Sequence, residues 1–178
     1  MTLSLLVIAA LLLFWGLGAY NRLMRLRNAI SGAWQQLEAP LTELVDAGGQ
    51  LAEAGPRWLP QEGGAFEALR AQGAELQTAL KATSATPFAA DPVAQLAVAH
   101  ALHASALQRV LALLDPVVSE DGEAERRTLI ARLRAAQQQR DFGKKLFNGR
   151  VAIYNEALAE VPTRALAGLY GFHDAKSF

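Results

Sequence analysis

The 178-residue chain contains no cysteine, and neither sign of charge is in excess. The absence of cysteine excludes a disulfide framework, a thiolate metal site and a cysteine nucleophile, and it suits a reducing compartment. Lysine plus arginine and aspartate plus glutamate number 17 each. Because nucleic-acid sites need a concentrated positive field, we do not expect nucleic acid as a partner.

Charged side chains are missing altogether from residues 1–19, and the run LSLLVIAALLLFWGLGA is nearly all apolar. About 20 apolar residues in a helix cross the hydrocarbon core of a bilayer. Arg22, Arg25 and Arg27 follow this run, and positive flanks stay on the cytoplasmic side. We therefore predict a single-pass anchor over residues 1–20 in a bacterial inner or plasma membrane, with the N-terminus outside and the rest cytoplasmic.

A cleavable secretory signal is the main alternative for this segment. Such signals begin with a basic stretch and end at a small-x-small site. Here no basic side chain precedes Arg22, and the best site, Leu17-Gly18-Ala19, has a bulky first residue. We expect the anchor to be retained, and an extracytoplasmic bundle on a signal anchor remains an alternative.

β-Branched residues are few outside the anchor, while alanine, leucine, glutamine, glutamate and arginine dominate. These are helix formers, and apolar residues recur at steps of three or four, so the sequence predicts an all-α protein. The first amphipathic block follows the anchor directly, and Pro40 inside it predicts a kink near Leu37 or a break. A connection is expected over residues 55–64.

Three further helices are predicted, with one short helix after them. The second helix covers residues 66–82, and the third runs from Asp91 to about Leu114. The fourth begins between residues 122 and 125 and ends at about Glu160, and the short helix covers residues 163–169. Asp91 before Pro92 is a favourable helix start. Short connections favour antiparallel neighbours, so the transmembrane helix should continue into an antiparallel up-and-down four-helix bundle. The predicted bundle spans residues 21–161, and a short helix and tail near the membrane span residues 162–178.

Two histidines are the strongest candidates for chemistry. His100 and His103 lie three residues apart on one helix, a spacing at which two imidazoles can face one metal ion. Carboxylate-type metal sites in bundles use Glu-x-x-His, and no such motif occurs in the sequence. We therefore expect packing residues and no cofactor. A metal-binding or enzymatic bundle using His100 and His103 is the alternative.

The asparagines form two pairs with the same spacing. Asn21 and Asn28 are seven residues apart on the first helix, as are Asn148 and Asn155 on the fourth. They are either ordinary solvated residues or a polar ladder that fixes the register of two helices. The second reading predicts that the first and fourth helices are neighbours, with Asn21 opposite Asn155 and Asn28 opposite Asn148.

The tail is rich in apolar and aromatic residues. If the fourth helix returns antiparallel to the first, these side chains should lie at the headgroup boundary or against the base of the bundle. Gly168 and Gly171 would let the backbone turn there. The side chains concerned are Leu166, Leu169, Tyr170, Phe172 and Phe178.

Both ends of the chain carry motifs that resemble those of the LemA family. The first motif follows the anchor and comprises Tyr20-Asn21, Leu23, Arg27-Asn28, Ala33-Trp34 and Leu41. The second comprises Phe147-Asn148, Val151 and Tyr154-Asn155, which is similar to a Tyr-Asn-x-x-Val-x-x-Tyr-Asn motif. The third is the segment PTRALAGLYGF, which includes Gly168, Gly171 and Phe172.

The middle of the chain departs from this resemblance. Thr42-Glu43-Leu44 stands where the family has a basic cluster, and Ala47-Gly48-Gly49-Gln50 is also different. The resemblance implies a divergent LemA-type protein: a cytoplasmic helical bundle on one membrane helix, with no activity generally established. We accordingly expect a scaffold or interaction protein and not an enzyme. Its expected partners are the lipid bilayer and other membrane proteins or a second copy.

Overall fold

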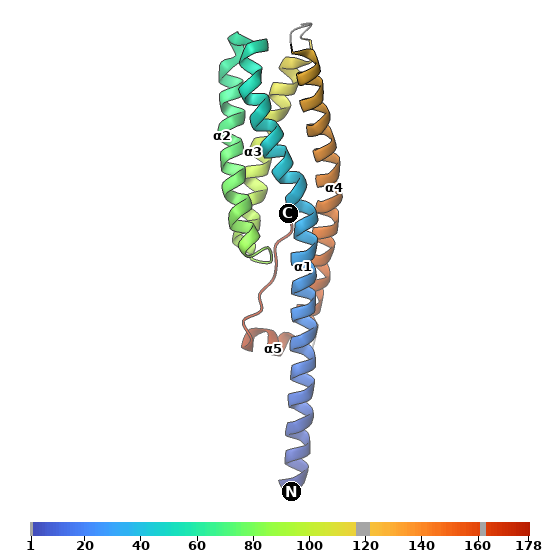
Figure 1. The fold of residues 1–178 in the computed structure, drawn as a ribbon. Helices are drawn as coiled ribbons and strands as arrows, with labels where there is room; N and C mark the ends of the chain where they lie inside the picture. Colours follow the sequence, from blue (N-terminus) through green and yellow to red (C-terminus); the bar gives the residue numbers. More distant parts are fainter. Residues whose placement is uncertain (1, 117–121, 161–162) are drawn as a thin grey trace.

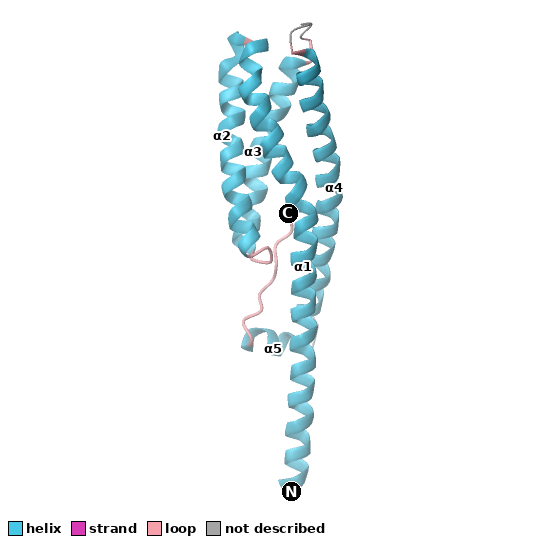
Figure 2. Cartoon of the chain, in the orientation of Figure 1, coloured by secondary structure: helices cyan, strands magenta, loops and turns pink. Residues whose placement is uncertain are grey.

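The computed structural model describes residues 2–116, 122–160 and 163–178, which form helices and loops and no strand (Figure 2). The long helices are α1 (Thr2–Trp58), α2 (Gly63–Ala85), α3 (Ala90–Leu114) and α4 (Glu123–Ala159). A 3-10 turn, η1 (Pro60–Glu62), joins α1 to α2, and a short helix, α5 (Thr163–Leu169), follows α4.

The long helices form an up-and-down bundle from which the apolar N-terminal part of α1 projects (Figure 1). Helix α4 lies antiparallel along α1, and α2 and α3 form a hairpin that packs on α1 through α2. The predicted all-α bundle with a long apolar N-terminal helix is confirmed. The predicted neighbourhood of the first and fourth helices is confirmed as well.

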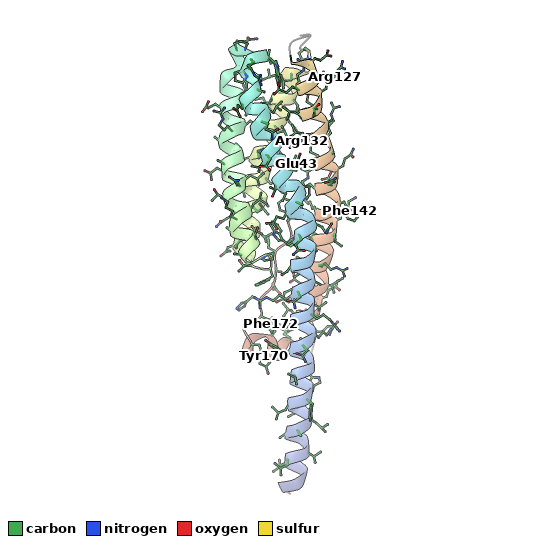
Figure 3. All side chains as sticks on the ribbon, in the orientation of Figure 1. Glu43, Arg127, Arg132, Phe142, Tyr170 and Phe172 are labelled. Atoms are coloured by element: carbon green, nitrogen blue, oxygen red, sulfur yellow. The ribbon has the colours of Figure 1, made fainter. Side chains whose placement is uncertain are left out.

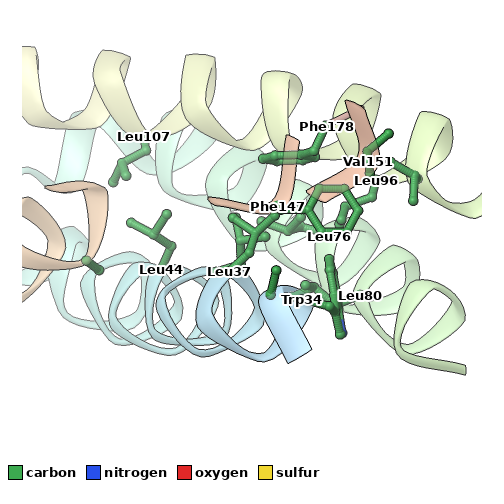
Figure 4. Packing of buried hydrophobic residues seen from close by; sticks show 14 of the residues in the cluster. Trp34, Leu37, Leu44, Leu76, Leu80, Leu96, Leu107, Phe147, Val151 and Phe178 are labelled. Carbon is green, nitrogen blue, oxygen red and sulfur yellow. The ribbon is translucent and has the colours of Figure 1, made fainter. Parts of the chain in front are cut away.

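The core consists of the apolar stripes that the sequence shows at helical spacing. Leu37, Leu41 and Leu44 of α1 are no more than 2% exposed. They lie in one cluster with Leu76 of α2 and Leu96 of α3, and Figure 4 shows several of these side chains together. Each helix therefore buries one face and leaves the other to solvent, as its periodicity predicts.

Helix α1 is continuous across Pro40, so a break there is wrong. Proline has no N–H, which leaves the carbonyl of Gln36, four residues earlier, without its helical donor. Helix α4 approaches this point closely at Gly143. A Cβ at Gly143 would lie 2.5 Å from the Gln36 carbonyl oxygen and 2.9 Å from Leu37 Cα. The carbonyl that Pro40 frees thus faces the Cα of Gly143, an arrangement that suits a Cα–H···O contact.

Two predicted boundaries are wrong. The expected connection over residues 55–64 is mostly helical, because α1 extends through Pro56 to Trp58 and α2 starts at Gly63. Helix α3 starts at Ala90, so Asp91 lies in its first turn and makes no side-chain cap hydrogen bond. A carboxylate in the first turn is still favourable because it opposes the helix dipole. The predicted domain boundary at residues 161–162 lies outside the described residues.

The tail reverses direction after α5. Gly171 has a φ of 68°, and the N–H of Phe172 donates to the Ala167 carbonyl at 2.9 Å. This is a Schellman motif, in which the left-handed residue is usually glycine. Residues after Phe172 then run back along the bundle, so Phe178 ends beside the middle of the helices (Figure 1). The predicted place of Phe178, at the headgroup boundary or against the base of the bundle, is therefore wrong. The side chains of Leu166 and Leu169 lie outside the described part.

Candidate interaction site

Aromatic side chains and one arginine cluster at the end of the bundle from which the apolar segment projects. The Tyr20 ring lies 5.3 Å from the Tyr170 ring and 5.7 Å from the Phe172 ring, between centroids. The Arg27 guanidinium carbon lies 3.6 Å from the centroid of Phe88 and 5.7 Å from that of Phe172. Figure 3 shows Tyr170 and Phe172 at α5, beside α1. This base cluster confirms that Phe172 packs against the base of the bundle.

Two asparagines of α4 hold the returning tail by its backbone. The Asn155 amide donates to the Ala175 carbonyl and accepts from the Ala175 N–H, both at 2.9 Å. The Asn148 amide donates to the Phe178 carbonyl at 2.9 Å and accepts from its N–H at 2.8 Å. We call residues 172–178 the strap.

The predicted asparagine ladder between the first and fourth helices is wrong. The amides of Asn148 and Asn155 are engaged by the strap, and Asn21 and Asn28 are exposed. The register also differs by about one helical turn, because Trp34 packs edge-on to Phe147 with ring centroids 6.1 Å apart.

Tyr154 completes the hold on the strap. Its hydroxyl donates to the His173 carbonyl at 3.1 Å, and its ring is buried. Burial raises the pKa of Tyr154 above its ordinary value, against the opposing effect of Arg27. The phenol therefore remains protonated and able to donate at neutral pH.

The far end of the strap lies between α3 and α4. The Phe178 ring is 5.2 Å from the His100 ring of α3, and the Lys144 ammonium of α4 lies 5.2 Å from the Phe178 centroid. The Arg140 guanidinium of α4 donates to His100 Nε2 at 2.8 Å. Because a cationic donor occupies that nitrogen, His100 serves as a hydrogen-bond acceptor between two helices.

His103 lies deeper, in the space that two glycines leave. Its side chain is 1% exposed, and a Cβ at Gly48 of α1 would lie 3.2 Å from its Nε2. A Cβ at Gly73 of α2 would lie 3.9 Å from Cδ2 of the same His103 ring. Within the described ranges no group of three or more histidine, aspartate or glutamate side chains could hold a metal ion. The structure thus gives His100 and His103 different neighbours, and both pack inside the bundle.

Both histidines are neutral in the folded protein. Burial lowers the pKa of His100 to about 4, and the nearby positive charge of Arg140 acts in the same direction. Burial alone lowers the pKa of His103 to about 4. The ordinary pKa of histidine is 6.5, so the unfolded chain takes up protons first as the pH falls.

We therefore predict an acid-labile bundle. The contribution of the two neutral rings to the free energy of unfolding is complete above pH ~6.5. It is lost progressively between pH ~6.5 and pH ~4, where the unfolded chain binds protons and the folded chain does not. Between pH 7.5 and 5.0 the free energy of unfolding should fall by roughly 1–2 kcal/mol per histidine, because one pH unit corresponds to ~1.4 kcal/mol. Urea unfolding in detergent micelles measures this. Replacing both by glutamine should flatten the profile and His173→Gln should not; equal stabilities at both pH values would contradict the account.

The remaining motif residues pack in the core or lie on the surface. Trp34, Phe147 and Val151 are at most 3% exposed. Gly168 is exposed, and a side chain there would meet open space. Residues 20–34, 147–155 and 163–172, which carry the described parts of the motifs, meet at the base of the bundle and along the strap. Reasoning from sequence missed the contacts of Arg27 with Phe88 and of Arg140 with His100.

The segment that departs from the LemA resemblance ties α1 to α4. Glu43 accepts from Arg132 Nε at 2.8 Å, and Gln50 accepts from Arg132 Nη1 at 2.8 Å. Figure 3 shows Glu43 and Arg132 side by side. At the end of the bundle away from the projecting segment, Arg57 of α1 pairs with Glu125 of α4 at 3.1 Å. In this chain the acidic Glu43 thus meets a basic residue from the fourth helix.

Two described helices are long and apolar enough to cross a membrane, α1 and α3. Their surroundings differ. Helix α3 packs beside α2 and buries six side chains, including Leu96 and Leu107, in the bundle. In α1 the apolar stretch from Leu5 to Leu13 makes no contribution to the core, and Leu13 is 75% exposed. No protein-family model matches the chain, and no curated protein matches it either.

Proposed function

We propose that the chain is a divergent LemA-type protein: a cytoplasmic helical scaffold held on the membrane by residues 1–20. The observation that carries this proposal is the projecting part of α1, where Leu12, Leu13 and Phe14 are 61–75% exposed. An apolar surface of this extent needs a cover, and a helix that is apolar on all sides is typical of a membrane span.

The base of the bundle has the composition expected next to a bilayer. Tyr20 and Tyr170 form an aromatic pair where α1 leaves the bundle, and aromatic side chains favour the headgroup region. Arg22 lies there too, paired with Glu160 at 2.6 Å, and Arg25 is exposed. These positive charges support an orientation with the N-terminus outside and the bundle in the cytoplasm, in a bacterial inner or plasma membrane.

A role in interaction, and not in catalysis, is proposed because several polar side chains of the described bundle hold its own helices and strap together. His100, Tyr154 and the two asparagines of α4 all bond to the chain itself. The chain also presents open apolar surface to a partner, at a groove of about 520 Å³ between α2 and α3. Val98 and Leu102, which line this groove, are 62% and 52% exposed.

Crosslinking in native membranes followed by affinity capture tests the proposal. We expect specific products that contain a second copy or another membrane protein, identified by mass spectrometry. The matched control carries Leu12→Lys and Leu13→Lys, which should release the chain from the membrane and remove those products. Stoichiometric zinc or iron in purified protein, lost on His103→Ala, would instead favour a metal-binding bundle.

A further inference from the structure

The strap lies in a groove that the bundle itself leaves open. Helices α3 and α4 make little direct contact with each other, and the strap lies between them. Residues on both helices reach it: His100 from α3, and Lys144, Asn148, Tyr154 and Asn155 from α4. This strap groove is therefore a surface built to hold an extended chain.

The spacing of the asparagines fits the repeat of an extended chain. Seven residues of α-helix rise about 10.5 Å, and three residues of extended chain span about 10 Å. Asn155 and Asn148 accordingly pair with residues 175 and 178, three positions apart. Each amide both donates to and accepts from the backbone of one residue, so the recognition does not depend on the side chain held.

Burial along the strap has the same period of three. Phe172, Ala175 and Phe178 are 5–8% exposed, whereas residues 173, 174, 176 and 177 are exposed. The hydrogen bonds to the strap backbone thus supply affinity. The buried positions of Phe172, Ala175 and Phe178 supply selectivity for a sequence with a small residue between two aromatic ones. Recognition of extended peptides commonly combines these two elements.

We propose that the strap groove is a binding site for an extended peptide with the pattern Phe-x-x-Ala-x-x-Phe, which the chain's own strap fills in the absence of another ligand. The ligand that these contacts specify is the strap of a second copy, because its sequence and backbone match every one of them. This inference rests on the proposed role in binding other proteins and names the chemistry that one partner would present.

A labelled synthetic peptide of residues 170–178 tests the inference by fluorescence anisotropy. Three forms are compared in detergent micelles: the full chain, a chain that ends at Gly171, and full-length Ala175→Asp, which puts a charge in a buried position of the strap. The full chain should bind the peptide at least about tenfold more weakly than the other two, because its own strap competes at high effective concentration. Circular dichroism reports whether each form is folded.

The asparagines provide matched variants in the strap-free background. Asn148→Ala and Asn155→Ala should each weaken peptide binding about tenfold, since each removes two backbone hydrogen bonds. Asn21→Ala and Asn28→Ala, equally spaced but exposed on α1, should leave it unchanged. If the chain that ends at Gly171 is unfolded, Ala175→Asp alone decides the outcome.

Absence of saturable binding to the folded variants, or binding indifferent to Asn148 and Asn155, would overturn the inference. Its failure is distinguishable from failure of the proposed function. If the groove is no peptide site, crosslinked membrane partners persist and the peptide does not bind. If the scaffold role is wrong, the full chain yields no anchor-dependent products in the first place.

Discussion

Phe147→Ala is expected to destabilise the bundle by about 3–5 kcal/mol, the range for a fully buried phenylalanine. The Phe147 side chain is 0% exposed and packs edge-on to Trp34 at the contact of α1 with α4. Its removal leaves a cavity at the contact of α1 with α4. Urea unfolding followed by circular dichroism at pH 7.5 measures the loss.

Phe142→Ala is the matched control for this substitution. Phe142 lies on the same helix and is 67% exposed, so its removal should change the free energy of unfolding by no more than about 0.5 kcal/mol. Figure 3 shows it on the outer side of α4. Equal effects of the two substitutions would show that Phe147 is not in the core.

Gly143→Ala is expected to cost about 1–3 kcal/mol, although alanine is the better helix former. The new methyl group would lie 2.5 Å from the Gln36 carbonyl oxygen and 2.9 Å from Leu37 Cα, so the two helix backbones must separate. Backbone atoms cannot rotate away as a flexible side chain could.

Gly149→Ala tests the same change where space is available. Gly149 is also in α4, and a Cβ there has no neighbour within 4 Å. This substitution should stabilise the protein by up to about 1 kcal/mol through helix propensity. Opposite signs for the two glycines are the expected result; a stabilising Gly143→Ala would refute the close approach of α1 and α4.

Helical periodicity was enough to predict the bundle and the short helix at residues 163–169. The pairing of the first and fourth helices was predicted from the equal spacing of the asparagines, and it is correct although the ladder itself is wrong. The rules of helix propensity failed at Pro56, and of the kink or break expected at Pro40 the break is wrong, because propensity describes an isolated helix. In the folded chain, α4 packs against the carbonyl that Pro40 frees, and α1 stays helical. Tertiary contact overrides a local preference there.

The site was only partly visible in the sequence. The equal spacing of Asn148 and Asn155 was a usable signal, but the partner assigned to it was wrong. The correct partner is the strap, in which every third residue (Phe172, Ala175 and Phe178) is buried. Three residues of extended chain are about as long as seven residues of helix, so the two spacings match. The stacking of Arg27 on Phe88 had no such signal, because it joins α1 to a loop whose path depends on the whole fold.

The placement of the N-terminus and the bundle on opposite sides of a membrane is the central claim, and cysteine labelling tests it most directly. Because the chain has no cysteine, single cysteines at Thr2→Cys and at exposed Gln138→Cys are unambiguous reporters. In spheroplasts, a membrane-impermeant maleimide should label position 2 and not position 138, and inverted vesicles should give the reverse. Labelling of position 138 in spheroplasts, or release of the chain from membranes by alkaline carbonate, would contradict a membrane-anchored cytoplasmic bundle.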